Sequence, residues 1–407
     1  MARTHRIPAN VYVLAVCQSL SVSCTLFLGL LGGIIGAAIA PSAGLATLPV
    51  SCGIVGTAIT TIPAALLMQR LGRPRAFAIG GIIAAMAGLL AAAAIAAGNF
   101  ALFCCAGFGI GAHMAFAQHY RFAAAESVIP ARVSQAISVV LLGTLLAALL
   151  APGLATQSAD WMASSRYSAS FLVVSLLALG AAMLVQFAAP ATQPADFRSE
   201  PTRPLRSIVS QPRFLVAVIS AAVGYGVMSF IMTATPISMH VMDGHSLDDT
   251  AWVIQSHVLA MYLPSFFSGA LIRRFGPRRM MLAGIAANIA CIALGLTGRG
   301  IHDYWGALVM LGIGWNFLFV AGTTMLTTCY NSSERFRVQA ANDFAVFSAS
   351  AAGSFAAGSV LHTWGWQGVQ LAAAPGLVLI LTALILIRSD TDSKSPGVRV
   401  SGIRSAD

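Results

Sequence analysis

Charged residues are so widely spaced in this chain that long apolar runs separate them. Residues 7–69 and 76–120 contain no Asp, Glu, Lys or Arg. Seven later runs also lack them: 133–159, 167–195, 214–242, 250–272, 280–298, 304–333 and 344–387. Because a helix needs roughly 20 apolar residues to cross a bilayer core, the three longest runs can hold two helices each and the other six one each. The pattern predicts twelve transmembrane helices.

Turn-forming residues mark where each of the three longest runs divides. They are APSAG at 40–44, GNF at 98–100 and HTWGW at 362–366, in which Gly, Pro, Ser and Asn favour turns. A transmembrane β-barrel would alternate apolar and polar residues over segments of about ten, and these runs do not alternate. The predicted fold class is therefore an all-α membrane protein.

The composition agrees with a chain that lies mostly in lipid. It is 57% hydrophobic and 9% charged, with a mean hydropathy of +0.81, whereas soluble domains carry about 25% charged residues. Too few charges remain to cover a water-facing surface, which excludes a soluble globular protein. The lipid bilayer is the first partner that the sequence predicts.

The basic residues predict the orientation. With the N-terminus inside the cell, all but Arg166 and Arg299 of the 23 Lys and Arg fall in cytoplasmic segments, as the positive-inside rule requires. Both termini are therefore expected in the cytoplasm, with the helices in a bacterial inner (plasma) membrane. The same bias explains the net charge of +10, so this charge predicts no nucleic-acid partner.

The two halves of the chain repeat each other. ALLMQRLGRPR at 65–75 matches GALIRRFGPRR at 269–279 after a shift of 204 residues, and GIGAH at 109–113 matches GIGWN at 312–316 after a shift of 203. Two parallel six-helix repeats are a known transporter plan. The expected division is a six-helix bundle at 1–189, a Pro- and Arg-rich cytoplasmic linker at 190–212, a second bundle at 213–389 and a cytoplasmic tail at 390–407.

The stretch 269–279 resembles the loop signature of the major facilitator superfamily, G-x-x-x-D-R-x-G-R-R, and 65–75 is similar but weaker. The resemblance implies a secondary transporter in which two bundles rock about a central site, with helices 1, 4, 7 and 10 lining the path. The acidic position of the signature is Gln69 in the first copy and Arg273 in the second. The lock that this acid helps to form in the family is therefore rebuilt or absent here.

Two further resemblances bear on the solute. Drug–proton antiporters of the family carry an intramembrane arginine in helix 4, and the matching residue here is Cys105, which weakens classical drug efflux. AFAQHYRFAAAES at 115–127 and GIGWNFLFVAGTTML at 312–326 are similar to a bacterial subgroup that includes riboflavin importers. The resemblance implies a vitamin-like solute such as riboflavin. The polar residues predicted at membrane depth carry little fixed charge, which suits a neutral or weakly charged solute. Multidrug or metabolite efflux is the alternative, and a non-transporting membrane sensor is the alternative of another class.

Polar residues at membrane depth cost free energy, so they face a cavity or another helix. Those predicted to bind the solute are Gln18, Thr25, His113, Tyr225, Ser229, Trp315 and Asn316. His113 and Asn316 are equivalent in the repeat and are expected to face each other at mid-depth, with Trp315 stacking on a solute ring. The alternative for each is helix packing.

Four residues are predicted to act in coupling or gating. Arg70, Arg274 and Arg278 lie in the two signature loops, where they would set the balance between conformations. Asp343 is the acid that lies inside an apolar stretch, near the cytoplasmic start of helix 11. It is expected either to pair with loop arginines or to carry a coupled proton.

The motifs of enzymes are missing from the sequence. It has no P-loop, no H-E-x-x-H and no G-x-S-x-G, and its seven cysteines form no C-x-x-C pair. We therefore expect no enzyme activity, no catalytic or metal-binding residues and no cofactor. The expected partners are a small-molecule substrate, the bilayer and protons as a candidate coupling ion, and the expected state is a monomer.

Overall fold

The computed structural model describes residues 7–129, 132–187, 203–331 and 334–392. Within these ranges every regular element is a helix. The predicted tail at 390–407 and the linker up to residue 202 lie almost wholly outside the described residues. The fold is all-α, as the apolar runs predict.

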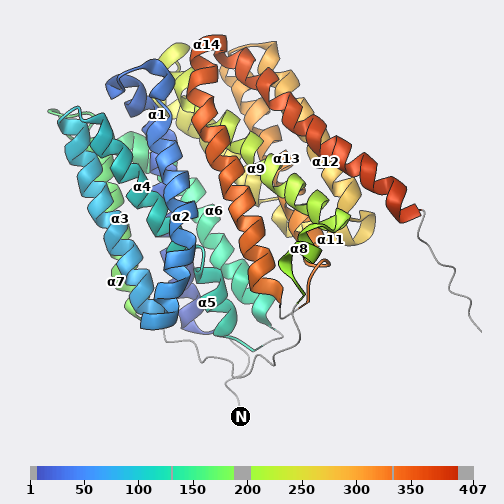
Figure 1. Ribbon diagram of the computed structural model, residues 1–407. Helices are drawn as coiled ribbons and strands as arrows, with labels where there is room; N and C mark the ends of the chain where they lie inside the picture. The colour runs from blue at the N-terminus through green and yellow to red at the C-terminus, as the bar shows by residue number, and fades with distance from the viewer. Residues whose placement is uncertain (1–6, 130–131, 188–202, 332–333, 393–407) are drawn as a thin grey trace, which may run out of the picture.

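The first half of the chain, up to residue 187, folds into long antiparallel helices (Figure 1). Its elements are α1 (Ala9–Ile39), η1 (Ala43–Leu45), α2 (Leu48–Leu71), α3 (Arg73–Ala96), α4 (Phe100–Ala117), α5 (Tyr120–Glu126), α6 (Val133–Ser158), α7 (Ser168–Leu184) and η3 (Val185–Phe187). The elements of the second half are α8 (Leu205–Val209), α9 (Pro212–Pro236), η4 (Ile237–Met242), α10 (Leu247–Tyr262), α11 (Ser265–Phe275), α12 (Pro277–Thr297), α13 (Ile301–Leu326) and α14 (Arg335–Asp392).

Ten helical segments of the described residues are long and apolar enough to span a membrane. One of them, α14, bends at Gly365, whose φ of 66° suits glycine, and its two legs run in opposite directions (Figure 1). Nine segments, the two legs of α14, and the shorter α10 make twelve passages. This agrees with the predicted number.

The predicted breaks are confirmed. The APSAG stretch separates α1, which ends at Ile39, from α2, and Gly98 and Asn99 separate α3 from α4. The bend at Gly365 falls inside the HTWGW stretch. Turn chemistry therefore located all three divisions of the long runs.

The repeated GIG sequence lets helices pack closely in both halves. A Cβ atom on Gly111 of α4 would lie 1.7 Å from the carbonyl oxygen of Gly53 in α2. A Cβ atom on Gly312 of α13 would lie 2.7 Å from the carbonyl oxygen of His257 in α10. Only glycine leaves room for these backbones, so each glycine allows a close helix contact in its own half. The two contacts are not equivalent in the repeat, because the shift of 203 pairs Gly111 with Gly314, which lies against Gly284 and Asn288 of α12.

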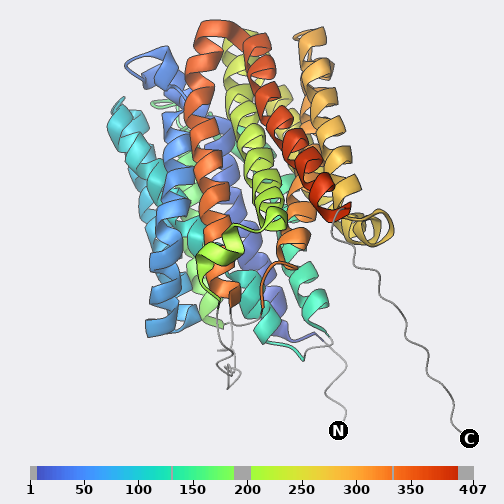
Figure 2. The same cartoon turned by 45° about the vertical axis from the view of Figure 1, so that its right-hand side comes forward.

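The two halves touch near one end of the bundle. We call this the far end, because it lies opposite the start of α1, and the other the near end (Figure 2). Ser51 near the start of α2 and Ser354 late in the first leg of α14 share a 2.8 Å hydrogen bond. Gly358 lies so near η1 that a Cβ atom there would be 2.6 Å from the carbonyl oxygen of Gly44. Further in, Gln255 Nε2 donates to the Leu149 carbonyl at 2.7 Å.

Candidate functional site

An aromatic cluster lies among α9, α10, α13 and α14 in the second half. Trp315 and Phe319 stack with their ring planes 8° apart and their centroids 5.0 Å apart. Tyr225 meets both rings edge-on, at 5.4 and 5.9 Å. Tyr262 lies edge-on to Trp315 at 6.0 Å, and Phe347 to Tyr225 at 6.2 Å. Four helices therefore contribute rings to one cluster.

The stacked pair follows from helical spacing. Trp315 and Phe319 are four residues apart on α13, so their side chains lie on one face of the helix. Trp315 is 5% exposed, whereas Phe319 and Tyr225 are half-buried. The buried indole N–H of Trp315 has no hydrogen-bond acceptor among the described residues, and such a group costs about 1–3 kcal/mol. The cluster thus combines ring faces with an unused donor.

A pocket of about 260 Å³ adjoins the stack along α13. Phe319, Val320, Thr323, Thr324 and Thr327 line it. Ligand sites usually measure roughly 300–1,000 Å³, so this pocket can hold only part of a vitamin-sized molecule. One aromatic ring of the stack and three threonines offer that part both an apolar and a polar wall.

A charged pair lies toward the near end, beside the cluster. Arg121 of α5 interacts electrostatically with Asp343 of α14 and with Tyr262. The two charged groups belong to different halves, and they are not among the ion pairs formed within 4.0 Å in the described part of the chain. Asp343 instead accepts a 3.1 Å hydrogen bond from Asn342 Nδ2. The near end therefore holds opposite charges, one from each half, that interact without forming an ion pair.

The sequence of the whole chain decides the family. A family model described as Major Facilitator Superfamily matches residues 11–254 and 237–405.

The chain belongs to the Major Facilitator Superfamily.

Two bacterial transporters are similar to this chain over most of its length. The chain is 40% identical over 383 residues to the Riboflavin transporter RfnT of Brucella anthropi, which covers 93% of this chain and 95% of the relative. It is 26% identical over 361 residues to an uncharacterized MFS-type transporter, YddS, of Bacillus subtilis, covering 84% and 83%. Membership of this superfamily of transporters is consistent with the expectation that the chain is not an enzyme.

Solved structures share the fold. A bacterial homologue of the lysosomal transporter Spinster, inward-facing and unoccupied, superposes with a TM-score of 0.73 at 13% identity, covering 96% of this chain and 98% of the other. The nucleoside transporter NupG superposes with a TM-score of 0.72 at 13% identity (92% and 99% covered), and a D-xylose–proton symporter with 0.70 at 15% (93% and 97%). At these identities the likeness establishes the major facilitator fold alone.

Within this fold, two of the predicted solute-binding residues lie in the aromatic cluster: Tyr225 and Trp315. Ser229, one turn from Tyr225 on α9, shares a 2.6 Å hydrogen bond with Ser350 of α14 and is buried. Ser229 therefore joins two helices of its own half, which was the alternative for this residue.

The helix 1 candidates lie apart from the cluster. Gln18 is buried and donates from Nε2 to Thr144 Oγ1 of α6 at 3.2 Å. Thr25 is half-buried, and its hydroxyl donates to the Val22 carbonyl of its own helix at 2.8 Å. Gln18 contributes to packing in the first half, while Thr25 keeps part of its surface open.

His113 and Asn316 do not face each other, so this expectation needs correction. The His113 ring is fully buried beside the backbone of Gly80 in α3, and neither of its nitrogens makes a hydrogen bond of normal geometry. The Asn316 amide is also buried but points to α10 and α11, where all its bonds are made within the protein. Because neighbours on a helix differ by about 100°, Trp315 reaches the cluster and Asn316 cannot.

The signature-loop arginines act within their own halves. Arg278 Nη2 donates to the Leu384 carbonyl of α14 at 2.6 Å. Arg274 lies over the ring of Phe275, 5.3 Å from its centroid, and Arg70 is exposed. In the first half the paired arginine is Arg73, which the sequence did not single out: it forms an ion pair with Glu126. None of these contacts reaches the other bundle.

Other residues of the site were not predicted from the sequence. Phe319 could have been found, because it follows the candidate Trp315 at helical spacing. Phe347 carried no such signal. The interaction of Arg121 with Asp343 depends on how the two halves sit together.

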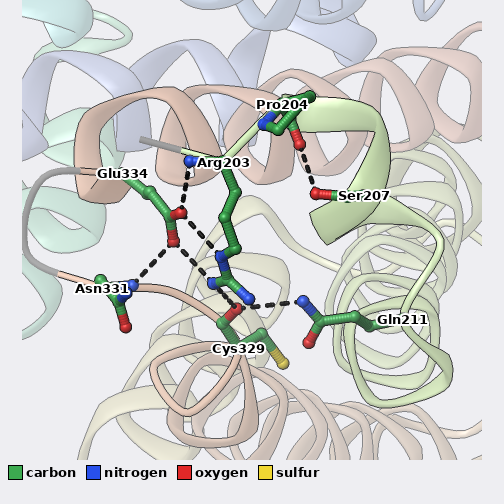
Figure 3. Close-up of polar contacts among 7 residues, drawn as sticks. All are labelled: Arg203, Pro204, Ser207, Gln211, Cys329, Asn331 and Glu334. Atoms are coloured by element: carbon green, nitrogen blue, oxygen red, sulfur yellow. Dashed lines mark hydrogen bonds and ion pairs between the residues drawn. The ribbon is translucent and has the colours of Figure 1, made fainter. Parts of the chain in front are cut away.

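The end of the linker is fastened to the second half (Figure 3). Arg203 donates to the Glu334 carboxylate from its backbone N–H (2.9 Å), Nε (2.7 Å) and Nη2 (2.6 Å). The Asn331 N–H adds a fourth bond to this carboxylate at 2.9 Å, and the Cys329 carbonyl accepts from Arg203 Nη2 at 3.1 Å. We call this group the linker clamp. Arg203 and the Asn331 N–H lower the pKa of Glu334 to about 2.

Proposed function

We propose that this protein transports riboflavin, or a closely similar planar solute, across a bacterial inner membrane by alternating access, with both termini in the cytoplasm. The observation that carries the proposal is the stacked Trp315–Phe319 pair with Tyr225 at its edge. The similarity to the riboflavin transporter of Brucella anthropi over nearly the full length supports the choice of solute.

The chemistry of the cluster suits an uncharged ring system that carries carbonyl groups. Aromatic faces attract one another in stacked or edge-on arrangements, so a flavin ring can pack against Phe319 and Tyr225. A carbonyl of the flavin can accept a hydrogen bond from the indole N–H of Trp315 once the ring has entered the cluster. The hydroxyls of Thr323 and Thr324 already donate to their own helix, which leaves their oxygens to accept bonds from the polar arm of the solute.

The contacts between the halves support access from one side. Direct hydrogen bonds and close backbone approaches lie at the far end or half-way along, whereas Arg121 and Asp343 remain separate at the near end. With the N-terminus in the cytoplasm, the pocket would open to the cytoplasm in this conformation. We infer that transport closes the near end, through approach of these two charges, as the far end opens.

Counterflow of radiolabelled riboflavin into proteoliposomes loaded with unlabelled riboflavin tests the proposal. We expect saturable uptake of riboflavin and none of D-xylose, the control solute, whose symporter shares only the fold. Purified protein that melts cooperatively but shows no riboflavin counterflow would overturn the proposal. Binding of riboflavin without counterflow would identify a sensor, and counterflow of unrelated drugs with none of riboflavin would identify an efflux carrier.

A further inference from the structure

The second copy of the signature differs from the first in its helix. In the first half, α2 runs without a break from Leu48 to Leu71. Its counterpart stops at Tyr262 and resumes at Ser265 as α11, beyond Pro264, which has no N–H to continue the helix. In Figure 2 the gold helix α11 is seen nearly end-on beside the start of α12, so it crosses the direction of the long helices.

Asn316 fastens this break to α13. Its Nδ2 donates to the Met261 carbonyl and to Ser265 Oγ, each at 2.7 Å, and its Oδ1 accepts from Ser268 Oγ at 2.7 Å. One amide therefore binds the last turn of α10 and the first turn of α11. Such full pairing of a buried amide is expected where a helix is interrupted inside a protein.

The outer side of α11 is aromatic and unpartnered in the protein. Phe266 and Phe267 are 56% and 66% exposed, and Phe275 at the end of the helix is also exposed. The inner side carries Ser268 and Ile272, which are buried. This helix therefore presents large apolar rings away from the bundle, at the level where α12 begins.

Arginines that are unpaired among the described residues follow the exposed phenylalanines in the sequence. Arg273, Arg274 and Arg279 form no ion pair in the described part of the chain, and Arg278 bonds only a carbonyl. The sequence from 250 to 302 contains no Asp or Glu that could neutralise them. Basic side chains next to exposed aromatic ones are the composition of helices that lie in a membrane surface.

We propose that α11 is a membrane-surface helix that binds anionic phospholipid, with Phe266 and Phe267 among the acyl chains and Arg273 and Arg274 on the headgroup phosphate. Each basic residue near an anionic leaflet strengthens the attraction to it. Asn316, which holds α11 in place, is the neighbour of Trp315 on α13, so lipid bound to α11 would lie two contacts away from the aromatic cluster. The inference concerns the membrane and does not depend on the solute.

The test is native mass spectrometry of the full-length protein in detergent, with dioleoyl phosphatidylglycerol and dioleoyl phosphatidylcholine added in turn. Wild type should retain phosphatidylglycerol in preference. Arg273→Gln with Arg274→Gln should reduce that preference about tenfold or more, since 1.4 kcal/mol is tenfold. Arg273→Lys with Arg274→Lys should retain most of it, because the charge remains.

The matched control is the first copy of the signature, Arg70→Gln with Arg75→Gln, which has no exposed phenylalanines beside it. We expect this variant to keep the wild-type preference. An unchanged preference in the Arg273/Arg274 glutamine variant would overturn the proposal, as would an equal loss in the control. Should the glutamine variant fail to fold, Phe266→Ser with Phe267→Ser provides the second arm, and an unchanged retention of phosphatidylglycerol in it would also overturn the proposal.

Discussion

Ser51 and Ser354 share a 2.8 Å hydrogen bond between α2 and α14, and so join the two halves of the protein through a pair of hydroxyls. Ser354 also accepts from Thr233 Oγ1 of α9 at 3.2 Å. Hydroxyl pairs are weak enough, at about 0.5–1.5 kcal/mol each, to be made and broken in every transport cycle. Tight backbone contact at Gly358 accompanies them.

Gly358→Leu should prevent closure of the far end. The new side chain would meet the Gly44 backbone, because even its Cβ would lie 2.6 Å from that carbonyl oxygen. We expect riboflavin counterflow to fall by more than tenfold while riboflavin binding persists. Gly153→Leu is the control, since no heavy atom lies within 4 Å of a Cβ there. Equal counterflow in the two variants would contradict the assignment of the far-end gate.

Phe319→Ala should weaken riboflavin binding about tenfold, because it removes one face of the stack, a contact that together with its buried area is worth on the order of 1.4 kcal/mol. Quenching of riboflavin fluorescence by the purified protein measures the affinity. The matched control is Trp305→Leu, from a second stacked pair, Trp252 and Trp305, with centroids 5.8 Å apart. Wild-type affinity in Phe319→Ala would move the solute site elsewhere.

Asn316→Ala should destabilise the fold rather than weaken solute binding. The change removes the Asn316 hydrogen bonds to the buried Met261 carbonyl, to Ser265 Oγ and to Ser268 Oγ, although the Ser268 hydroxyl keeps the Pro264 carbonyl as a partner. Losing the partner of a buried polar group costs about 1–3 kcal/mol. We expect a lower melting temperature with riboflavin affinity within threefold of wild type. Its repeat equivalent His113→Leu removes an unpartnered ring and should cost less. A tenfold loss of affinity at normal stability in Asn316→Ala would restore the prediction that it binds solute.

Glu334→Gln should destabilise the protein in a pH-dependent way. Because the pKa of Glu334 falls from 4.5 to about 2 on folding, its charged form contributes stability above pH 4.5, and this contribution disappears as the pH falls toward 2. Melting temperatures of wild type and variant should differ by the same amount at pH 7 and pH 5, and by less at pH 3. A difference in melting temperature that does not change with pH would show that the charge of Glu334 does not contribute to the linker clamp.

Arg121 and Asp343 should behave as a coupled pair in exchange assays. Arg121→Gln and Asp343→Asn remove the same near-end attraction, so the double variant should exchange riboflavin no more slowly than the worse single variant. The charge swap Arg121→Asp with Asp343→Arg should recover part of the rate. Additive losses would argue against the pair. Loss of uphill accumulation with normal exchange in Asp343→Asn would instead assign this carboxyl to proton coupling.

The sequence predicted what depends on neighbours along the chain. The helix breaks at 40–44 and 98–100 and the fold class followed from apolar runs and turn residues. Tyr225 was singled out as a polar side chain at membrane depth, and Trp315 as the neighbour of Asn316. Which face of α13 meets the cluster was not predictable, since Trp315 and Asn316 differ only by a rotation that packing decides. The approach of Arg121 to Asp343, 222 positions apart (343 − 121), requires the assembled halves.

One local signal was overlooked. Pro264 interrupts the apolar run 250–272, and a proline inside a helix removes a hydrogen bond and displaces the preceding turn. A candidate break between α10 and α11 was therefore present in the sequence, although Pro63 lies inside α2 without interrupting that helix. Its fastening by Asn316 was not, because the amide comes from a helix about 50 residues later.

The linker clamp determines where this chain can be divided. Arg203 and Glu334, the two ends of the clamp, both belong to the second half, so a cut anywhere in 188–202 leaves every described contact of Arg203 inside one fragment. The two fragments would then need to find each other only through the helix surfaces that already meet in the intact protein. We propose that the covalent connection keeps two partners together, and that the second partner begins at Arg203 rather than at residue 213.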